Sequence, residues 1–502
     1  MTARPLGSLL ASAGIVPVAP FAPEAVVRGV SIDSRTVRPG DVFFALRGER
    51  EDGSRFASDA LARGAVAVVA DGAAPAPELG EAWVRVEDAR LAMGLVAREW
   101  FDRPDTSLTL VGITGTKGKT TVTYLVESIA AAAGLTAGRI GTVGYAYAGR
   151  ESAATRTTPE ATDLYALLAA MRDASVSVVA MEVSSHALTL HRVAGARFPV
   201  AAFLNLGRDH LEFHGGSEAY FEAKASLFSR LQPSDAAVLP ADDPLGGVLS
   251  DRTAARVLRF GRDEAAEVRI VRERSGLAGS SVTLATPSGS LEVTTPLPGR
   301  FNVDNVAAAV GCAVALRLPA AAIRTGIAAL RSVPGRLEPV EAGQPFAVLV
   351  DYAHTEESLA AVLDAVRPLT PGRLIVVFGC GGDRDRAKRP RMGRAAAMRA
   401  DLLFLTSDNP RSEDPAAILR EIAFGVATVE AAPERSRIVE DRRDAIAAAI
   451  ALARAGDAVV IAGKGHETTQ AFADRTVSFD DRVVARACLA EIGHDGGSRA
   501  GA

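Results

Sequence analysis

The chain has 502 residues, which is enough for about three domains of ordinary size. Apolar residues make up 48% and charged residues 23%, close to the average of folded proteins, which excludes a disordered or fibrous chain. The formal net charge is −4, so no basic excess indicates a nucleic acid partner, and we expect none. Three cysteines are too few for a disulfide framework or a zinc ribbon and favour a reducing, cytoplasmic location.

The N-terminal segment, residues 1–25, has some features of a signal peptide, because one early arginine precedes a mostly apolar run. Gly14, Pro17 and Pro20 interrupt that run, and the low cysteine count argues against export. No apolar run approaches the roughly 18 residues that a membrane span needs. We therefore expect no exported form and no stable membrane anchor.

Two blocks with different patterns make up the first two thirds of the chain. Residues 1–104 contain short strand-like runs between Gly and Pro turns, at 27–34, 41–46 and 65–70, and predict a smaller α/β domain. Residues 105–332 open with a buried-strand pattern at 107–114, followed by a glycine-rich turn and a helix that ends at Gly134. Later strand patterns lie at 176–183, 200–206 and 235–240, and a β-rich stretch precedes a helix that begins near Phe301. Strands that alternate with helices predict a mostly parallel sheet of the phosphate-loop type.

The third block, residues 333–502, repeats this alternation and predicts a Rossmann-like, doubly wound sheet. In such sheets ligands bind beyond the carboxyl ends of the strands. Polar residues gather at these predicted ends, namely Asp351 and His354, Asp383 and Arg384, residues 408–411 and residues 464–467. The sequence thus predicts an α/β protein of three domains, with a ligand site at this edge of the third.

A glycine-rich turn between a predicted strand and a predicted helix carries the most specific local signal. It consists of Gly115, Thr116, Lys117, Gly118, Lys119, Thr120 and Thr121. Backbone N–H groups of such a turn close around phosphate oxygens, and the start of the helix adds partial positive charge. Lys119 would reach the outer phosphates and the Thr120 hydroxyl would bind Mg²⁺. Ile113 stands where the strict pattern has its first glycine, so an ordinary turn between strand and helix is the alternative.

A carboxylate at a strand end should complete the magnesium site, and Glu182 follows an apolar strand as this requires. A structural salt bridge is the alternative role for Glu182. His210 and His214 have a spacing that zinc ligands use, but no cysteine accompanies them, and phosphate with Mg²⁺ calls for oxygen ligands. We expect hydrogen-bonding roles for most of the histidines and a functional role for His210.

Segments from about residue 31 to residue 482 together resemble the Mur ligase family, which makes bacterial peptidoglycan precursors. In chain order they are VGITGTKGKTT, MEVSSHAL, NLGRDHLEFHG, YFEAKASLF, RFNVDNVAAA, VPGRLE, DYAHTEESL, FGCGGDRDRAKRPRMG, TSDNPRSEDP and GKGHE. The resemblance implies an ATP-dependent amide ligase that serves cell wall biogenesis, and through it cell shape and cell division.

The implied reaction adds meso-diaminopimelate to UDP-MurNAc-L-Ala-D-Glu. The D-Glu γ-carboxylate attacks ATP, and the amine of the amino acid then displaces phosphate from the resulting acyl phosphate. L-Lysine or another diamine as the added amino acid is the alternative. The implied cofactors are ATP and Mg²⁺, and we expect a monomer.

The resemblance also implies roles for individual residues of the reaction centre. Lys119, Lys224 and His210 match catalytic positions, and Thr120, Glu182, His210 and Lys224 match metal positions, the lysine as its carbamate. Without the resemblance, Lys224 would be interpreted as a surface residue of a helix. Asn302, Arg336 and Asp351 match ATP contacts in addition to the phosphate loop, although Arg336 could instead form a hinge salt bridge with Glu338.

The remaining implied contacts concern the two other substrates. Ser34 and residues near 49–51 match the uridine end of the UDP substrate, and Thr157, Thr158, Ser184 and Arg192 match its muramoyl-peptide end. The implied diaminopimelate contacts are Arg384, Asp408, Asn409, Pro410, Arg411, Gly463 and Glu467. A guanidinium at Arg411 can grip the distal carboxylate that lysine lacks, and Glu467 could take an ammonium group. The alternative for residues 408–411 is a turn stiffened by proline with a solvated arginine.

Two other functions compete with this interpretation. Folylpolyglutamate synthetase is a related ATP-dependent ligase, but it lacks the DNPR and GKGHE segments together and a comparable N-terminal block. A nucleotide-operated scaffold without ligase activity would be favoured by loss of Lys119, Glu182 or Lys224, and all three are present.

Overall fold

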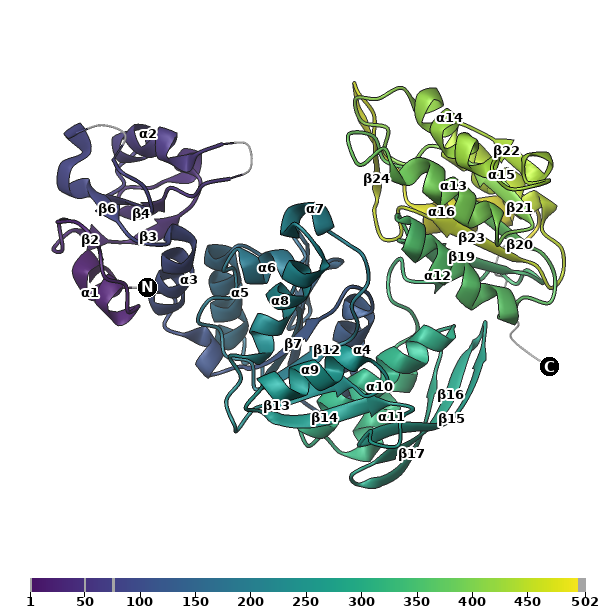
Figure 1. Ribbon diagram of the computed structural model, residues 1–502, viewed down its shortest axis with the longest axis horizontal. Coiled ribbons are helices and arrows are strands. Elements are labelled where there is room, and N and C mark those ends of the chain that lie inside the picture. Colours follow the sequence, from purple (N-terminus) through teal and green to yellow (C-terminus); the bar gives the residue numbers. More distant parts are fainter. Residues whose placement is uncertain (1, 49–50, 75–76, 495–502) are drawn as a thin grey trace. The chain divides into compact units, whose positions relative to one another are not determined.

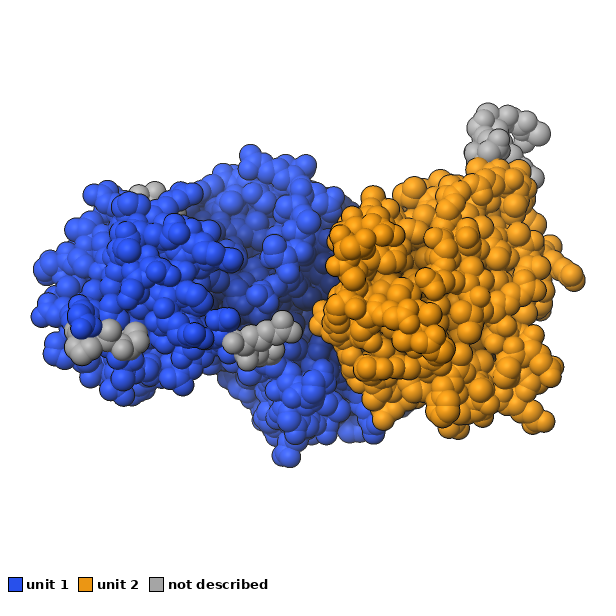
Figure 2. All heavy atoms as spheres, turned by 90° about the horizontal axis from the view of Figure 1, so that it is seen from above, with its two compact units in different colours: residues 1–269, 307–326 blue, residues 270–306, 327–502 orange. Residues whose placement is uncertain are grey.

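The computed structural model describes residues 2–48, 51–74 and 77–494, and divides into two compact units, which Figure 2 colours separately. Unit 1 comprises Met1–Arg269 and Ala307–Gly326, and unit 2 comprises Ile270–Val306 and Ile327–Ala502. Of the predicted uridine contacts, Glu49 and Arg50 lie outside the described residues. The predicted boundaries after residues 104 and 332 stay a prediction.

Unit 1 begins with a four-stranded parallel sheet, in the order β3-β4-β5-β6. Its strands are β3 (Gly29–Ser31), β4 (Asp41–Phe44), β5 (Ala67–Ala70) and β6 (Trp83–Arg85), accompanied by α1 (Leu6–Ser12), α2 (Ala57–Ala62), α3 (Ala89–Trp100) and the short pair β1 (Arg4–Pro5) and β2 (Val26–Val27) (Figure 1). Side chains alternate between the faces of β4: Val42 and Phe44 join one apolar core, and Phe43 joins the other. This period of two is the signature of a strand covered on both faces.

The larger sheet of unit 1 has parallel strands in the order β8-β11-β7-β12-β13-β14. These strands are β7 (Thr109–Thr114), β8 (Ala137–Ile140), β11 (Val178–Glu182), β12 (Val200–Phe203), β13 (Ala236–Pro240) and β14 (Arg256–Gly261). The antiparallel strands β9 (Gly144–Tyr147) and β10 (Arg150–Ala153) extend the edge beside β8. The helices are α4 (Lys119–Ala132), α5 (Ala161–Asp173), α6 (Ser185–Thr189), α7 (Leu211–His214), α8 (Ser217–Phe228) and α9 (Pro244–Arg252).

One apolar core serves both sheets of unit 1. It contains Phe44 of the first sheet, Trp100 at the end of α3, and Leu110 and Phe203 of the larger sheet, each at most 2% exposed. At the joint between the sheets, Arg98 Nε donates to Asp105 Oδ1 at 2.9 Å. Residues on either side of the predicted boundary at 104 therefore share a continuous hydrophobic interior.

Unit 2 contains the antiparallel pair β16 (Gly279–Thr286) and β17 (Gly289–Thr295) and a six-stranded sheet. Strand β15 (Val268–Gly276) and helices α10 (Arg300–Ala315) and α11 (Ala320–Ala329) each run across a division between the units. The six-stranded sheet has the order β18-β19-β23-β20-β21-β22 and is parallel except for its edge strand β18 (Glu338–Pro339).

The parallel strands of this sheet are β19 (Ala347–Asp351), β20 (Leu374–Phe378), β21 (Leu402–Leu405), β22 (Ser436–Ile438) and β23 (Ala458–Ala462). One face packs on α12 (Glu356–Val366), α13 (Lys388–Ala397) and α14 (Pro415–Val426), and the other on α15 (Arg442–Leu452) and α16 (Asp481–Glu491). A short hairpin, β24 (Thr469–Ala471) and β25 (Thr476–Ser478), follows β23. Helices on both faces confirm the predicted doubly wound architecture (Figure 1).

Within the described ranges, no helix is both long and apolar enough to cross a membrane.

Candidate active site

The predicted phosphate loop lies between β7 and α4, as the sequence indicates. Gly118 caps the helix with φ +87° and Gly115 has φ +149°, so both occupy the backbone region that favours glycine. The side-chain amide of Asn205 holds the loop: Lys117 N donates to Asn205 Oδ1 at 2.9 Å, and Asn205 Nδ2 donates to Lys117 O at 3.1 Å. Thr120 and Thr121 lie in the buried first turn of α4. The turn is thus a glycine-containing backbone held at the start of a helix, where N–H groups can bind phosphate.

Two lysine ammonium groups meet at one carbonyl oxygen of this loop. Lys119 Nζ and Lys224 Nζ each donate to Gly115 O at 2.9 Å, and Lys119 also donates to Thr116 O at 3.0 Å. Lys224 is 1% exposed, so the interpretation of this residue as a surface lysine, made from the residues alone, is wrong. The helix α8 lies against the loop rather than in solvent, and it carries Lys224 inward.

Burial is the main reason that the pKa of Lys224 lies well below its usual 10.5, and the nearby charge of Lys119 lowers it further. The Lys224 ammonium lies 4.4 Å from the ring of Tyr220, one helical turn earlier. The Tyr220 hydroxyl is 3.0 Å from Thr116 Oγ1. Sequence reasoning missed Tyr220, although its position four residues before Lys224 places both on one helix face.

Glu182 ends β11 and is 1% exposed. Its two carboxylate oxygens accept from Thr142, from the backbone N at 2.8 Å and from Oγ1 at 3.1 Å. No ion pair to Glu182 occurs among the described residues, which removes the salt-bridge alternative for the part of the chain that the structure covers. Glu182 is therefore a buried carboxylate held by neutral donors, as a metal ligand would be.

Three of the four residues predicted for the muramoyl-peptide end are joined by hydrogen bonds. Thr158 Oγ1 donates to Glu182 O at 2.8 Å and accepts from Ser184 N at 3.1 Å, while Arg192 Nη1 donates to Thr158 O at 3.3 Å. The fourth, Thr157, lies next to the same group, because its Oγ1 is 3.0 Å from that of Thr142. The structure therefore brings this set together beside Glu182.

Arg192 also has a partner that the sequence did not reveal. Its Nη2 lies 2.9 Å from Glu160 Oε1, and Arg90 and Arg156 lie 3.8 and 3.5 Å from the same carboxylate group. Three guanidinium groups around one buried carboxylate leave an excess of positive charge. The partner stands 32 residues away along the chain, and no local pattern links the two.

Ser34 is buried in the first turn after β3, in a short 3₁₀ helix (Ser34–Thr36). Within the described ranges it forms no hydrogen bond or ion pair with Thr157, Thr158, Ser184 or Arg192. No direct polar contact in the described part of the chain therefore joins the two predicted ends of the UDP substrate site.

His210 lies at the start of α7 with φ +55°, in a group of aromatic rings. Its ring centroid is 4.5 Å from that of His186, which also stacks on Phe213 at 4.1 Å. Burial is the main cause, and the charge of nearby His210 the second, of a pKa of about 4 for His186. His214 Nε2 is 3.0 Å from Ser185 Oγ. Within the described residues, no group of three or more His, Cys, Asp or Glu could hold a metal alone, so the spacing of His210 and His214 forms no zinc site there.

The predicted ATP contacts outside the phosphate loop all belong to unit 2. Asp351 ends β19 and accepts from Leu337 N at 2.7 Å and from Ala353 N at 2.8 Å. The Arg336 guanidinium lies 5.0 Å from the ring centre of Tyr352. Asn302 is 2% exposed on α10 and donates from Nδ2 to Pro298 O at 2.8 Å. Asp351 is thus bonded to the backbone of the residue that follows Arg336. Asn302 is held separately, by the carbonyl of Pro298 just before α10.

All the predicted diaminopimelate residues except Arg384 lie at the carboxyl ends of β21 and β23. Asn409 Nδ2 donates to Glu467 Oε2 at 2.8 Å, and a Cβ on Gly463 would stand 2.5 Å from Asp408 Oδ2. Pro410 is buried, and Arg411 has φ +53°. The residues 408–411 and 463–467 therefore form one surface built from two loops.

Arg411 is not simply a solvated arginine. Its Nη1 donates to Gly382 O at 2.6 Å, and its backbone N donates to Ala471 O at 3.0 Å. Arg384 is exposed on the loop after β20, where the same Gly381–Gly382 turn brings it near Arg411. A guanidinium anchored at one nitrogen keeps its other edge available for a carboxylate.

Comparisons with known proteins cover nearly the whole chain. Models described as "Mur ligase family, catalytic domain", "Mur ligase middle domain" and "Mur ligase, glutamate ligase domain" match residues 26–101, 113–313 and 335–465. A curated relative from Solibacter usitatus, named UDP-N-acetylmuramoyl-L-alanyl-D-glutamate--2,6-diaminopimelate ligase, is 46% identical over 493 residues, 97% of this chain and 99% of its own length. A relative of the same name from Geobacter metallireducens is 44% identical and covers 94% of this chain and 95% of its own length.

Solved structures agree with these relatives. One of a ligase with the same name is 32% identical, has a TM-score of 0.71, and covers 98% of this chain and 100% of its own. A folylpolyglutamate synthase from Mycobacterium tuberculosis, complexed with ADP and AMPPCP, covers 81% of this chain and 95% of its own at 21% identity and a TM-score of 0.62. That second likeness concerns the fold alone.

Proposed function

Because the chain belongs to the Mur ligase family, we propose that it is an ATP-dependent ligase that adds meso-diaminopimelate to UDP-MurNAc-L-Ala-D-Glu in peptidoglycan precursor synthesis. The observation that carries the proposal is the 46% identity, over nearly the full length of both chains, to a relative named for this reaction. The ends of β21 and β23 support the choice of amino acid, because Asn409 donates to Glu467 there and Arg411 follows Asn409 in the same loop.

The first step joins a carboxylate to the γ-phosphate of ATP, and ADP leaves. Both reactants are anionic, so cations and oriented N–H donors must offset their repulsion. The backbone of residues 115–118 and the start of α4 supply oriented donors, and Lys119 supplies a cation beside them. The product is an acyl phosphate, whose phosphate is the leaving group of the second step.

The second step forms the amide. The amine of the amino acid attacks the acyl carbon, phosphate leaves, and the amine gives up a proton. Arg411 orients the amino acid through its distal carboxylate, and Glu467 accepts an ammonium group. L-Lysine has no distal carboxylate, so Arg411 would lose its partner and discriminate against it.

The donors near the phosphate loop fit Mg²⁺, which prefers oxygen ligands. Glu182 is a buried carboxylate without an ion-pair partner among the described residues, and the Thr120 hydroxyl stands at the start of α4. Thr120, Glu182, His210 and the Lys224 carbamate would hold the metal, which neutralises charge on the phosphates when bound. Burial favours the neutral Lys224 amine, whose nitrogen can bond to the carbon of CO₂ and release a proton to give that carbamate.

The test is ADP release with ATP, Mg²⁺ and UDP-MurNAc-L-Ala-D-Glu, run beside meso-diaminopimelate, L-lysine or L-ornithine. We expect rapid release with meso-diaminopimelate and little with the other two. Release with lysine or ornithine instead would keep the ligase and overturn the role of Arg411. Release that needs neither the UDP substrate nor an amino acid would indicate a nucleotide-operated switch.

A further inference from the structure

Lys464 is a fully buried cation to which the proposed mechanism gives no role. It follows β23 by two residues, and its side chain is 0% exposed. A buried ammonium group is stable only when its hydrogens meet acceptors and its charge meets an opposite charge. The contacts of this one lysine therefore define a built polar centre.

Three acceptors surround the Lys464 ammonium group, which matches its three hydrogens. Its Nζ donates to Thr469 O at 2.6 Å, to Glu467 Oε2 at 3.1 Å and to Asn409 Oδ1 at 3.2 Å. Two of these acceptors are side chains proposed to bind the amino acid. They come from the loop after β21 and the loop after β23, which are more than 50 residues apart along the chain.

The contacts close into a triangle that fixes the orientation of both side chains. Asn409 Nδ2 donates to Glu467 Oε2 at 2.8 Å, and Asn409 Oδ1 also accepts from Ala471 N at 3.0 Å. Both contacts to the Glu467 carboxylate use Oε2, and no residue in the described ranges donates to Oε1. The Glu467 side chain is 33% exposed. Among the described residues, Oε1 is therefore the oxygen of this carboxylate that is left for a further donor.

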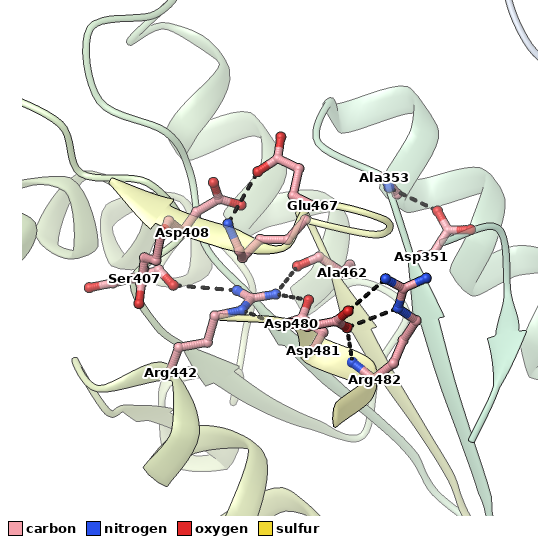
Figure 3. A network of polar contacts seen from close by, with 12 residues as sticks. Asp351, Ala353, Ser407, Asp408, Arg442, Ala462, Glu467, Asp480, Asp481 and Arg482 are labelled. Carbon is pink, nitrogen blue, oxygen red and sulfur yellow. Dashed lines mark hydrogen bonds and ion pairs between the residues drawn. The ribbon is translucent and has the colours of Figure 1, made fainter. Parts of the chain in front are cut away.

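A second buried cation fixes the backbone beneath this triangle. Arg442 and Asp481 are both 0% exposed and form two hydrogen bonds, each of 2.7 Å. Arg442 also donates to Ser407 O at 3.4 Å and to Ala462 O at 3.0 Å, the carbonyls just before Asp408 and Gly463. Figure 3 shows Arg442 pointing toward Ser407, Ala462 and Asp481. The two loops therefore leave the sheet from a common, rigid base.

We propose that Lys464 is a positioning residue for the incoming amino acid. Its ammonium group locks Asn409 and Glu467 of the two loops into one geometry and turns Glu467 Oε1 toward the ammonium group of that amino acid. The inference rests on the proposed function, and it adds a residue that need not touch the substrate. Loss of Lys464 weakens capture of the amino acid and leaves nucleotide binding unchanged.

The experiment measures ADP release with varied meso-diaminopimelate for the wild type and for Lys464→Met, which keeps the length of the side chain and removes the charge. We expect the KM for meso-diaminopimelate to rise at least about tenfold, since one partner of a buried charged group is lost. The KM for ATP should change less than about twofold, because a loss confined to one substrate marks a lost binding contact. A general folding defect would lower kcat or the active fraction and would not select one KM.

Arg373→Met is the matched control. Arg373 pairs with Asp457 at 2.7 Å, and Asp457 directly precedes β23, whereas Lys464 follows the other end of that strand. The Arg373→Met variant should leave both KM values unchanged. Lys464→Gln keeps a donor and serves if the Met variant does not fold. The double variant Lys464→Met/Glu467→Gln should raise the KM for meso-diaminopimelate no more than the larger single change, because both act through one carboxylate.

An unchanged KM for meso-diaminopimelate in folded Lys464→Met, or additive effects in the double variant, would overturn the inference alone. A wild type that releases no ADP with any of the amino acids would overturn the proposed function, and the inference with it. The two failures are therefore distinct.

Discussion

The cations at the start of α4 and those at the ends of β21 and β23 are held in opposite ways. Near α4, the ammonium groups of Lys119 and Lys224 converge on a single backbone carbonyl, Gly115 O. At the strand ends, Lys464 and Arg442 meet the carboxylates of Glu467 and Asp481. Burial, and repulsion between the two charges, lower the pKa of Lys224 and disfavour its charged form, whereas each pair at the strand ends is neutral already. The first region gains stability from an added anion. The second, the pairs Lys464–Glu467 and Arg442–Asp481, is charge-balanced before any ligand binds, and we call it the frame.

The largest expected effect tests the first region. Lys119→Met removes the cation that we propose to contact the phosphates of ATP, and we expect kcat/KM for ATP to fall about 100- to 1,000-fold in the ADP-release assay. Lys388→Met, in unit 2, is the control, because Lys388 donates to the carbonyl of His354 on the surface. A Lys119→Met enzyme with near wild-type turnover would remove the contrast between the two regions.

The next effect tests the frame. Arg442→Met leaves the Asp481 carboxylate buried without its partner, which costs about 3–5 kcal/mol of stability. The denaturant midpoint of unit 2, followed by circular dichroism, should fall accordingly. Arg443→Met breaks only an exposed pair with Glu491 and should change the midpoint little. Equal midpoints for the two variants would mean that the buried pair stabilises no more than a surface pair.

A smaller effect concerns selectivity. Arg411→Ala should raise the KM for meso-diaminopimelate roughly 30-fold, because the distal carboxylate loses its guanidinium partner. The KM for L-lysine should not rise. Arg475→Ala, which changes an exposed arginine of the neighbouring hairpin, is the control. If Arg411→Ala and Arg475→Ala gave the same KM for meso-diaminopimelate, the role of Arg411 in recognition would be wrong.

The smallest effect is a gain in stability. The folded pKa of Lys224 lies below 10.5, so the folded protein binds fewer protons than the unfolded chain between these two pKa values. Stability therefore rises with pH across that window, and the burial penalty is greatest at lower pH. In CO₂-free buffer, Lys224→Met should raise Tm by about 2 °C or more near pH 7, and the gain should shrink toward pH 10. A gain that is constant with pH would show that charge burial is not its cause.

Much of the fold could be predicted from local pattern. The strand patterns at 107–114, 176–183 and 200–206 correspond to β7, β11 and β12, because runs covered on both faces are almost continuously apolar. The same kind of pattern places Asp408 and Glu467 after strands, and parallel strands then bring them to one edge. These inferences need only the apolar pattern of each strand and the parallel orientation of the strands in the sheet.

The residues that sequence reasoning missed act across long separations. Glu160 pairs with Arg192, Asn205 holds Lys117, and Arg442 reaches Asp481, each through packing that no local period encodes. Lys224 was misjudged from the residues alone because the helix around it carries no clear apolar stripe. The sequence places Lys464 in a polar strand end, but its contact with Asn409, 55 residues earlier in the chain, follows from no local pattern.

The hydrophobic core that runs through both sheets of unit 1 has an evolutionary consequence. Trp100 and Leu110 lie on opposite sides of residue 104 and belong to the same interior. A gene fusion that exchanged the first hundred residues for those of another protein would have to match this interior side chain by side chain. An exchange of the N-terminal block is therefore tolerated only where the new block covers the apolar side chains around Trp100 and Leu110.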